Sequence, residues 1–113
     1  MAKYLVLAMT NPLPGRDSEF NEWYDRVAIP AYASLPHVRP LGRYRSVPHD
    51  GYEFEMKDIG FEYLSVYEIE TDDLEAAFSE IRVALAKATE EGRYHFSQTI
   101  DKGRFFEPVF VQI

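Results

Sequence analysis

The sequence predicts an α+β fold in which four strands and two helices follow the order strand, helix, strand, strand, helix, strand. Two stretches carry apolar residues at the 3.6-residue spacing of an amphipathic helix, and four are rich in the β-branched, aromatic and long apolar residues of strands. Right-handed crossovers place both helices on one face of a four-stranded antiparallel sheet. This is the ferredoxin-like arrangement.

Length and composition indicate a single domain over residues 1–113, with 46% hydrophobic and 27% charged residues. The net charge of −7 argues against nucleic-acid binding, which requires clustered Lys and Arg. The absence of Cys excludes disulfides, thiolate metal ligands and a Cys nucleophile, and is compatible with the cytoplasm, where we expect the protein. The apolar run at the N-terminus is too short for a signal peptide or a membrane span, so no membrane association is expected.

The first strand is expected at residues 3–10, followed by a turn at residues 11–15. Asp17 is expected to cap the first helix, which begins near residue 18. Pro30 lacks an amide hydrogen, so this helix should kink or end near Ala28. The large side chains of the helix share one arc, and they are Phe20, Trp23, Tyr24 and Val27.

The second strand is expected at residues 38–47, where Pro40 confines it to a sheet edge or marks a bulge. The third is expected at residues 61–69 and carries large apolar groups on both faces, which indicates cover on both sides. The second helix lies between a cap at Asp72 or Asp73 and Gly92, and the last strand spans residues 105–113.

These patterns leave one sheet face without cover, because two helices cover only one face while the strands are apolar on both. We therefore expect a homodimer in which the bare faces of two copies meet around a barrel-like interior. The aromatic content of 15% fits such an interior.

Several motifs in roughly the first 45 residues resemble the EthD-like members of the dimeric α/β-barrel superfamily. They are Asn11-Pro12, Gly15-Arg16, the segment Glu19-Phe20-Asn21-Glu22-Trp23-Tyr24-Asp25, Ile29-Pro30 and Arg43-Tyr44. The resemblance implies a small ferredoxin-like homodimer with a pocket between the first helix and the inner sheet face. It also implies kinship with cofactor-free cyclases, isomerases, lyases and oxygenases that act on aromatic or polyketide-like molecules.

The chain departs from that family pattern at Ala28, where a His usually precedes Ile-Pro. A methyl group transfers no proton, so any acid or base role of that His does not carry over. His37 replaces a Gly that often follows the next Pro, and it could substitute for the imidazole only if its loop folded back.

Tyr24 is the first candidate for catalysis, because a phenol at the edge of a pocket can donate a hydrogen bond to a substrate carbonyl or enolate. The alternative is a core aromatic residue. Glu68 lies among apolar side chains, where burial would make it a candidate base, although pairing with an Arg is the default expectation. His95 could carry a proton from a loop at the pocket mouth, or be a surface residue.

Asn21, Trp23, Arg43 and Tyr67 are the candidate ligand-binding residues. Asn21 could orient a ligand or simply solvate its helix, and Trp23 is more typical of a packing residue. Arg43 and Tyr44 point to opposite sheet faces; an inward Arg43 would bind a carboxylate or enolate, whereas the favoured outward position makes it part of a solvated basic face. No metal or cofactor motif occurs, so none is expected.

Two hypotheses follow for function. The first is a cofactor-independent lyase, isomerase or cyclase that acts on a small aromatic or polyketide-like molecule beneath the first helix. The second is a non-catalytic module of the same fold that binds a small ligand or serves as a structural dimer. Ala28 in place of His favours the second.

Overall fold

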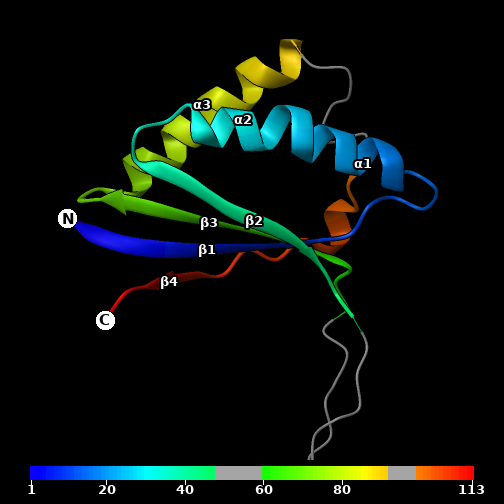
Figure 1. The fold of residues 1–113 in the computed structure, drawn as a ribbon, viewed down its shortest axis with the longest axis horizontal. Helices are drawn as coiled ribbons and strands as arrows, with labels where there is room; N and C mark the ends of the chain where they lie inside the picture. The colour runs from blue at the N-terminus through cyan, green and yellow to red at the C-terminus, as the bar shows by residue number, and fades with distance from the viewer. Residues whose placement is uncertain (48–59, 92–98) are drawn as a thin grey trace, which may run out of the picture.

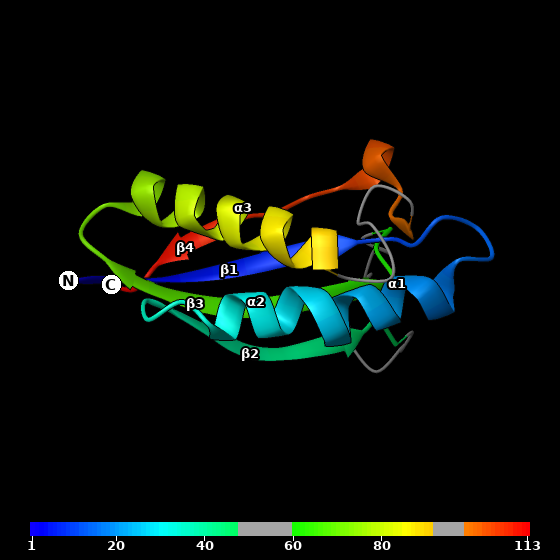
Figure 2. The same cartoon turned by 90° about the horizontal axis from the view of Figure 1, so that it is seen from above.

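The computed structural model describes residues 1–47, 60–91 and 99–113 and has the predicted α+β architecture (Figure 1). The helices lie together on one side of a single antiparallel sheet, and the view from above shows them side by side across it (Figure 2). The fold class predicted from the sequence is therefore confirmed.

The sheet has the strand order β2, β3, β1, β4. At its centre, β1 (Ala2–Thr10) pairs with β3 (Tyr63–Thr71) along the whole length of both strands. The edges are β2 (Val38–Arg45) beside β3 and the short β4 (Val109–Val111) beside β1. Alternate residues of the two central strands are buried under the helices, as the two-residue period of a strand requires.

The first helical segment is continuous through three geometries, namely α1 (Asp17–Trp23), a π-helical turn η1 (Tyr24–Ala28) and α2 (Ile29–Ala33). Pro30 predicts a kink or an end near Ala28; the helix does not end there, and its irregularity is the π-helical turn. The ring of Pro30 crowds the carbonyl four residues back, and the wider π-turn just before it accommodates this within the helix. The Ile29 amide donates to the Tyr24 carbonyl, which closes the wider turn.

The start of this segment also differs from expectation, because Asp17 is the first helical residue and Arg16 occupies the N-cap without a side-chain hydrogen bond. The Asp17 carboxylate instead accepts a 3.5 Å hydrogen bond from the Tyr63 hydroxyl. In α3 (Leu74–Glu91), by contrast, the expected cap is confirmed, since Asp73 Oδ1 accepts a bond from the Ala76 amide at 3.1 Å.

A bulge in β2 decides which face its side chains occupy. Pro40 is opposite Tyr67 and Gly42 is opposite Val66, so Leu41 is the extra residue between them. Gly42 adopts a φ of +153° in this bulge. The bulge shifts the alternation of the strand and turns Arg43, paired with Ser65, toward the helices.

The last strand is shorter than expected because Pro108 has no amide hydrogen to donate to a ladder. Pairing with β1 nevertheless extends beyond β4: the Met9 amide donates to the Phe106 carbonyl at 2.8 Å, and the Leu7 amide donates to the Pro108 carbonyl at 3.1 Å. Residues 106–112 thus follow β1 as an edge.

The sheet face away from the helices, the open face, carries exposed apolar residues beside the charged residues Lys3, Arg39 and Glu68. No helix of the described residues covers it (Figure 1). Tyr44, Phe106 and Phe110 are exposed by 56%, 55% and 55%. The half-buried apolar residues beside them are Leu5, Leu7, Met9, Leu64 and Val66. Within the described ranges, no helix is long and apolar enough to cross a membrane.

Candidate functional site

A cavity of about 410 Å³ lies between the first helical segment, α3 and the sheet. Its walls are mainly aromatic and aliphatic, with few polar groups, which is typical of small-molecule sites. The lining residues that matter for its chemistry are Trp23, Tyr24, Tyr32, Tyr67, Phe105 and Glu107. A larger hollow of about 570 Å³ near Asn11 is more open and more polar, so the aromatic cavity is the better candidate site.

Tyr67 and Glu107 form the shortest polar contact in this cavity. The Tyr67 hydroxyl donates a 2.6 Å hydrogen bond to Glu107 Oε1. Burial, together with Tyr32 and the Glu107 carboxylate, raises the pKa of Tyr67 well above its ordinary value. The phenol therefore holds its proton at neutral pH and shares it with a carboxylate.

Tyr24 is only 2% exposed and lies in the cavity wall as predicted. Burial raises its pKa to about 12, while a hydrogen bond with the Thr10 side chain and the positive charge of Arg43 act in the opposite direction. Its phenol is a neutral hydrogen-bond donor under physiological conditions.

Tyr32 stacks on Tyr67 with the ring centroids 4.7 Å apart. It is 6% exposed, and burial with neighbouring Tyr24 and Glu107 raises its pKa. Its hydroxyl forms no hydrogen bond with another side chain or backbone group of the described residues. A ligand in the cavity would find this hydroxyl unengaged.

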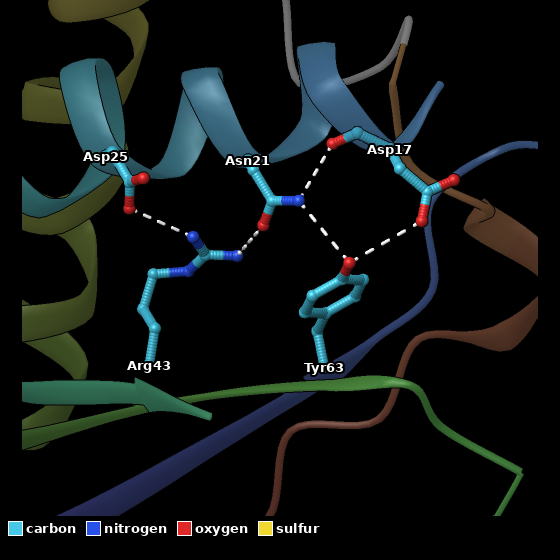
Figure 3. A network of polar contacts seen from close by, with 5 residues as sticks. All are labelled: Asp17, Asn21, Asp25, Arg43 and Tyr63. Atoms are coloured by element: carbon cyan, nitrogen blue, oxygen red, sulfur yellow. Dashed lines mark hydrogen bonds and ion pairs between the residues drawn. The ribbon is translucent and has the colours of Figure 1, made fainter. Parts of the chain in front are cut away.

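Arg43 joins a polar network beside the cavity, and Figure 3 shows its guanidinium reaching up from β2 to the first helical segment. Its Nη2 donates to Asn21 Oδ1 at 2.8 Å and its Nη1 to Asp25 Oδ1 at 2.9 Å. The Asn21 amide donates in turn to the Asp17 carbonyl at 2.9 Å and contacts the Tyr63 hydroxyl at 3.4 Å. With its side chain 17% exposed, Arg43 is not part of the solvated basic face that was favoured from the sequence.

This network engages the donors and acceptors of Arg43 and Asn21 within the protein. Neither residue lines the cavity. The Arg43 guanidinium does lie 4.6 Å from the centre of the Tyr24 ring, as a cation–π contact. Arg43 therefore contacts the cavity wall through the ring of Tyr24.

Glu68 does not join Tyr24, because it lies on the opposite face of the sheet. Its carboxylate pairs with Arg39 at 3.0 Å and with Lys3 at 3.9 Å. The default expectation of an Arg partner is confirmed, and the alternative of a buried base at the cavity is wrong. His95, the other proposed proton carrier, lies outside the described residues.

Of the predicted site residues, the structure brings Trp23, Tyr24 and Tyr67 together in the cavity wall. Sequence reasoning missed Tyr32 and Glu107. A signal for Glu107 was present, since it is the one charged residue in the apolar run from Phe105 to Val111. Within the ranges described, no cluster of three or more His, Cys, Asp or Glu is placed to hold a metal ion.

No protein-family model and no curated protein matches the sequence. Among solved structures, the fold is similar to the crystal structure of an uncharacterized NIPSNAP-like domain protein from Burkholderia xenovorans. That match has a TM-score of 0.59 and 17% identity over 98% of this chain and 85% of that chain. A likeness at this level of identity establishes the fold alone.

Proposed function

We propose that the aromatic cavity binds a small aromatic or polyketide-like molecule and that the protein is a cofactor-independent enzyme of the lyase, isomerase or cyclase kind. The observation that carries the proposal is the convergence of Glu107 with three protonated phenols in an apolar cavity of about 410 Å³. A carboxylate in such surroundings can accept a proton, and neutral phenols can donate hydrogen bonds to the oxyanion that forms.

The roles follow from the contacts. Glu107 replaces Glu68 as the base, because only Glu107 faces the cavity. Tyr32 and Tyr24 are the donors to a substrate carbonyl or enolate, and Tyr67 positions the Glu107 carboxylate through the 2.6 Å bond. Ala28 does not line the cavity, so this arrangement makes no use of position 28. The resemblance to EthD-like proteins in residues 11–44 supports the same class of ligand.

The proposal also includes a homodimer formed through the open face. Tyr44, Phe106 and Phe110 are each more than half exposed there, beside five further apolar side chains. Contiguous apolar surface of this kind is typical of an interface, and two-fold pairing through the same patch is the commonest way to bury it.

The experiment is solvent deuterium exchange, followed by NMR, on a panel of small aromatic and alicyclic ketones. We expect the protein to accelerate exchange beside the carbonyl of the compounds that bind, and Glu107→Gln to reduce this about 10²-fold or more. Glu80→Gln is the matched control, because Glu80 is exposed on α3 and does not line the cavity. Unchanged exchange in the Glu107→Gln variant would refute its role as the base.

A second candidate is a non-catalytic dimeric module of the same fold that binds a ligand or is purely structural. The extent of the open face favours it, since dimerisation accounts for those side chains without any chemistry. Binding of panel compounds with no deuterium exchange would support the ligand-binding form of this module.

A further inference from the structure

Glu107 has no cationic partner among the described residues, unlike several other acidic side chains of the protein. Glu19 pairs with Arg16, Asp25 with Arg43 and Glu68 with Arg39. In residues 1–47, 60–91 and 99–113, by contrast, no ion pair reaches Glu107, and its carboxylate is held by the Tyr67 hydroxyl. A partly buried negative charge without a counter-charge is costly, and a bound cation would relieve the cost.

No basic side chain of the described cavity wall forms an ion pair with Glu107. Arg82 is the one basic side chain among the described lining residues, and it is exposed, with its Nη2 donating to Ser79 Oγ at 3.0 Å. Arg43 lies outside the lining and is already bonded to Asn21 and Asp25. The negative charge inside the cavity is therefore available to a ligand.

The walls around Glu107 are also suited to a positively charged ligand. The aromatic rings that line the cavity belong to Trp23, Tyr24, Tyr32, Tyr67, Phe78 and Phe105. Aromatic faces attract ammonium groups through their quadrupole, and the attraction is largest where water is excluded. Glu107 and these rings line the same cavity, so a ligand there would contact both.

From these observations we infer that the ligand of the cavity is a small organic cation, an aromatic or apolar molecule that carries a protonated amine or a quaternary ammonium group beside Glu107. The inference rests on the proposed function in taking this cavity as the ligand site, and it adds the charge of the ligand. A cationic nitrogen also acidifies neighbouring C–H bonds, so the ligand class is compatible with proton transfer to a carboxylate. Tyr32 can accept a hydrogen bond from an amine at the same position.

The test is a charge series at nearly constant shape, measured by isothermal titration calorimetry. The probes are the N-methylquinolinium cation, neutral 1-methylnaphthalene and the 1-naphthoate anion. We expect the cation to bind at least about tenfold more tightly than the neutral probe, and the anion more weakly than both. Glu107→Gln keeps the shape of the side chain and should abolish the preference, whereas Glu80→Gln should keep it.

The outcomes separate the inference from the proposed function. Equal binding of all three probes, or tightest binding of the anion, would overturn the cation inference and leave the cavity as a ligand site. A cation preference that survives in the folded Glu107→Gln variant would also overturn it, because the charge would then lie elsewhere. Failure of every probe to bind the wild-type protein would overturn both the inference and the assignment of the cavity.

Discussion

The Tyr67 hydroxyl donates a 2.6 Å hydrogen bond to Glu107, which joins the central strand β3 to the segment that leads into the edge strand β4. The two residues are 40 positions apart in the sequence. Their contact fixes the carboxylate against the cavity wall and ties the last segment of the chain to the sheet. The contact is structural, and it positions the carboxylate of the proposed base.

Tyr67→Phe should therefore lower the free energy of unfolding by about 1–2 kcal/mol, because it removes the donor and leaves the Glu107 carboxylate without its partner. Urea denaturation measures the change. Tyr44→Phe is the control, since Tyr44 is 56% exposed, and its effect should stay within about 0.5 kcal/mol. Equal stability of the two variants would show that the Tyr67 bond contributes nothing net.

Local patterns predicted most of the fold. The aromatic arc of the first helix is buried, with Phe20 and Tyr24 exposed by 0% and 2%. In β3, Ser65, Tyr67 and Ile69 are all buried on one face, as the strict two-residue side-chain period of a strand requires. These features depend only on the spacing of residues within one element.

The candidate site was less predictable because it depends on contacts between distant elements. The bulge at Leu41 reverses the side of the sheet on which Arg43 lies, and Pro40 alone signals a bulge without placing it. The π-turn from Tyr24 to Ala28 shifts the helical phase in a way that a uniform 100° rotation misses. To predict the contact of Glu107 with Tyr67, one would have to know how the edge segment is aligned with β1.

The buried tyrosines predict a loss of stability at alkaline pH. Folding raises the pKa of Tyr24 to about 12 and also raises those of Tyr32 and Tyr67, whereas unfolded tyrosine titrates near pH 10. Their contribution is fully present below pH 10 and is lost as the pH rises from there toward the folded-state values, because only the unfolded chain releases protons in that window.

We expect the contribution of these tyrosines to the free energy of unfolding to be constant between about pH 8 and 9.5. Above that range it should fall by about 1.4 kcal/mol per pH unit for each buried tyrosine. Urea denaturation at a series of pH values, with tyrosinate absorbance as the second readout, measures the slope. Tyr32→Phe should reduce the slope and Tyr44→Phe should not. A stability that rises above pH 10 would contradict the prediction.

Arg43→Lys should destabilise the protein by about 1–2 kcal/mol. A lysine cannot reproduce the fork that bonds Asn21 at 2.8 Å and Asp25 at 2.9 Å, and it loses the planar contact with the Tyr24 ring. Arg45→Lys on the same strand is the control, because Arg45 is exposed. Chemical denaturation of both variants decides the matter; similar midpoints would mean that a point charge at position 43 is sufficient.

Phe110→Glu should convert the expected homodimer into a monomer. Phe110 pairs with Leu5 and is 55% exposed on the open face, so a carboxylate there would be buried without a partner in the dimer. Sedimentation velocity at micromolar concentration measures the change, with Val83→Glu as the control on α3, where Val83 is 70% exposed. A wild-type protein that sediments as a monomer would contradict the dimer itself.

Ala28→His would restore the residue that the EthD-like pattern usually has, yet it should destabilise this protein. Ala28 is 0% exposed within the hydrophobic core and does not line the cavity, so an imidazole would overpack the helix against the sheet. We expect a loss of about 1–3 kcal/mol in the free energy of unfolding and no gain in deuterium exchange. Ala76→His at an exposed position of α3 should cost less than about 0.7 kcal/mol. A stable Ala28→His variant with faster exchange would mean that this helix can turn position 28 toward the ligand, and Glu107 would then not be the sole base.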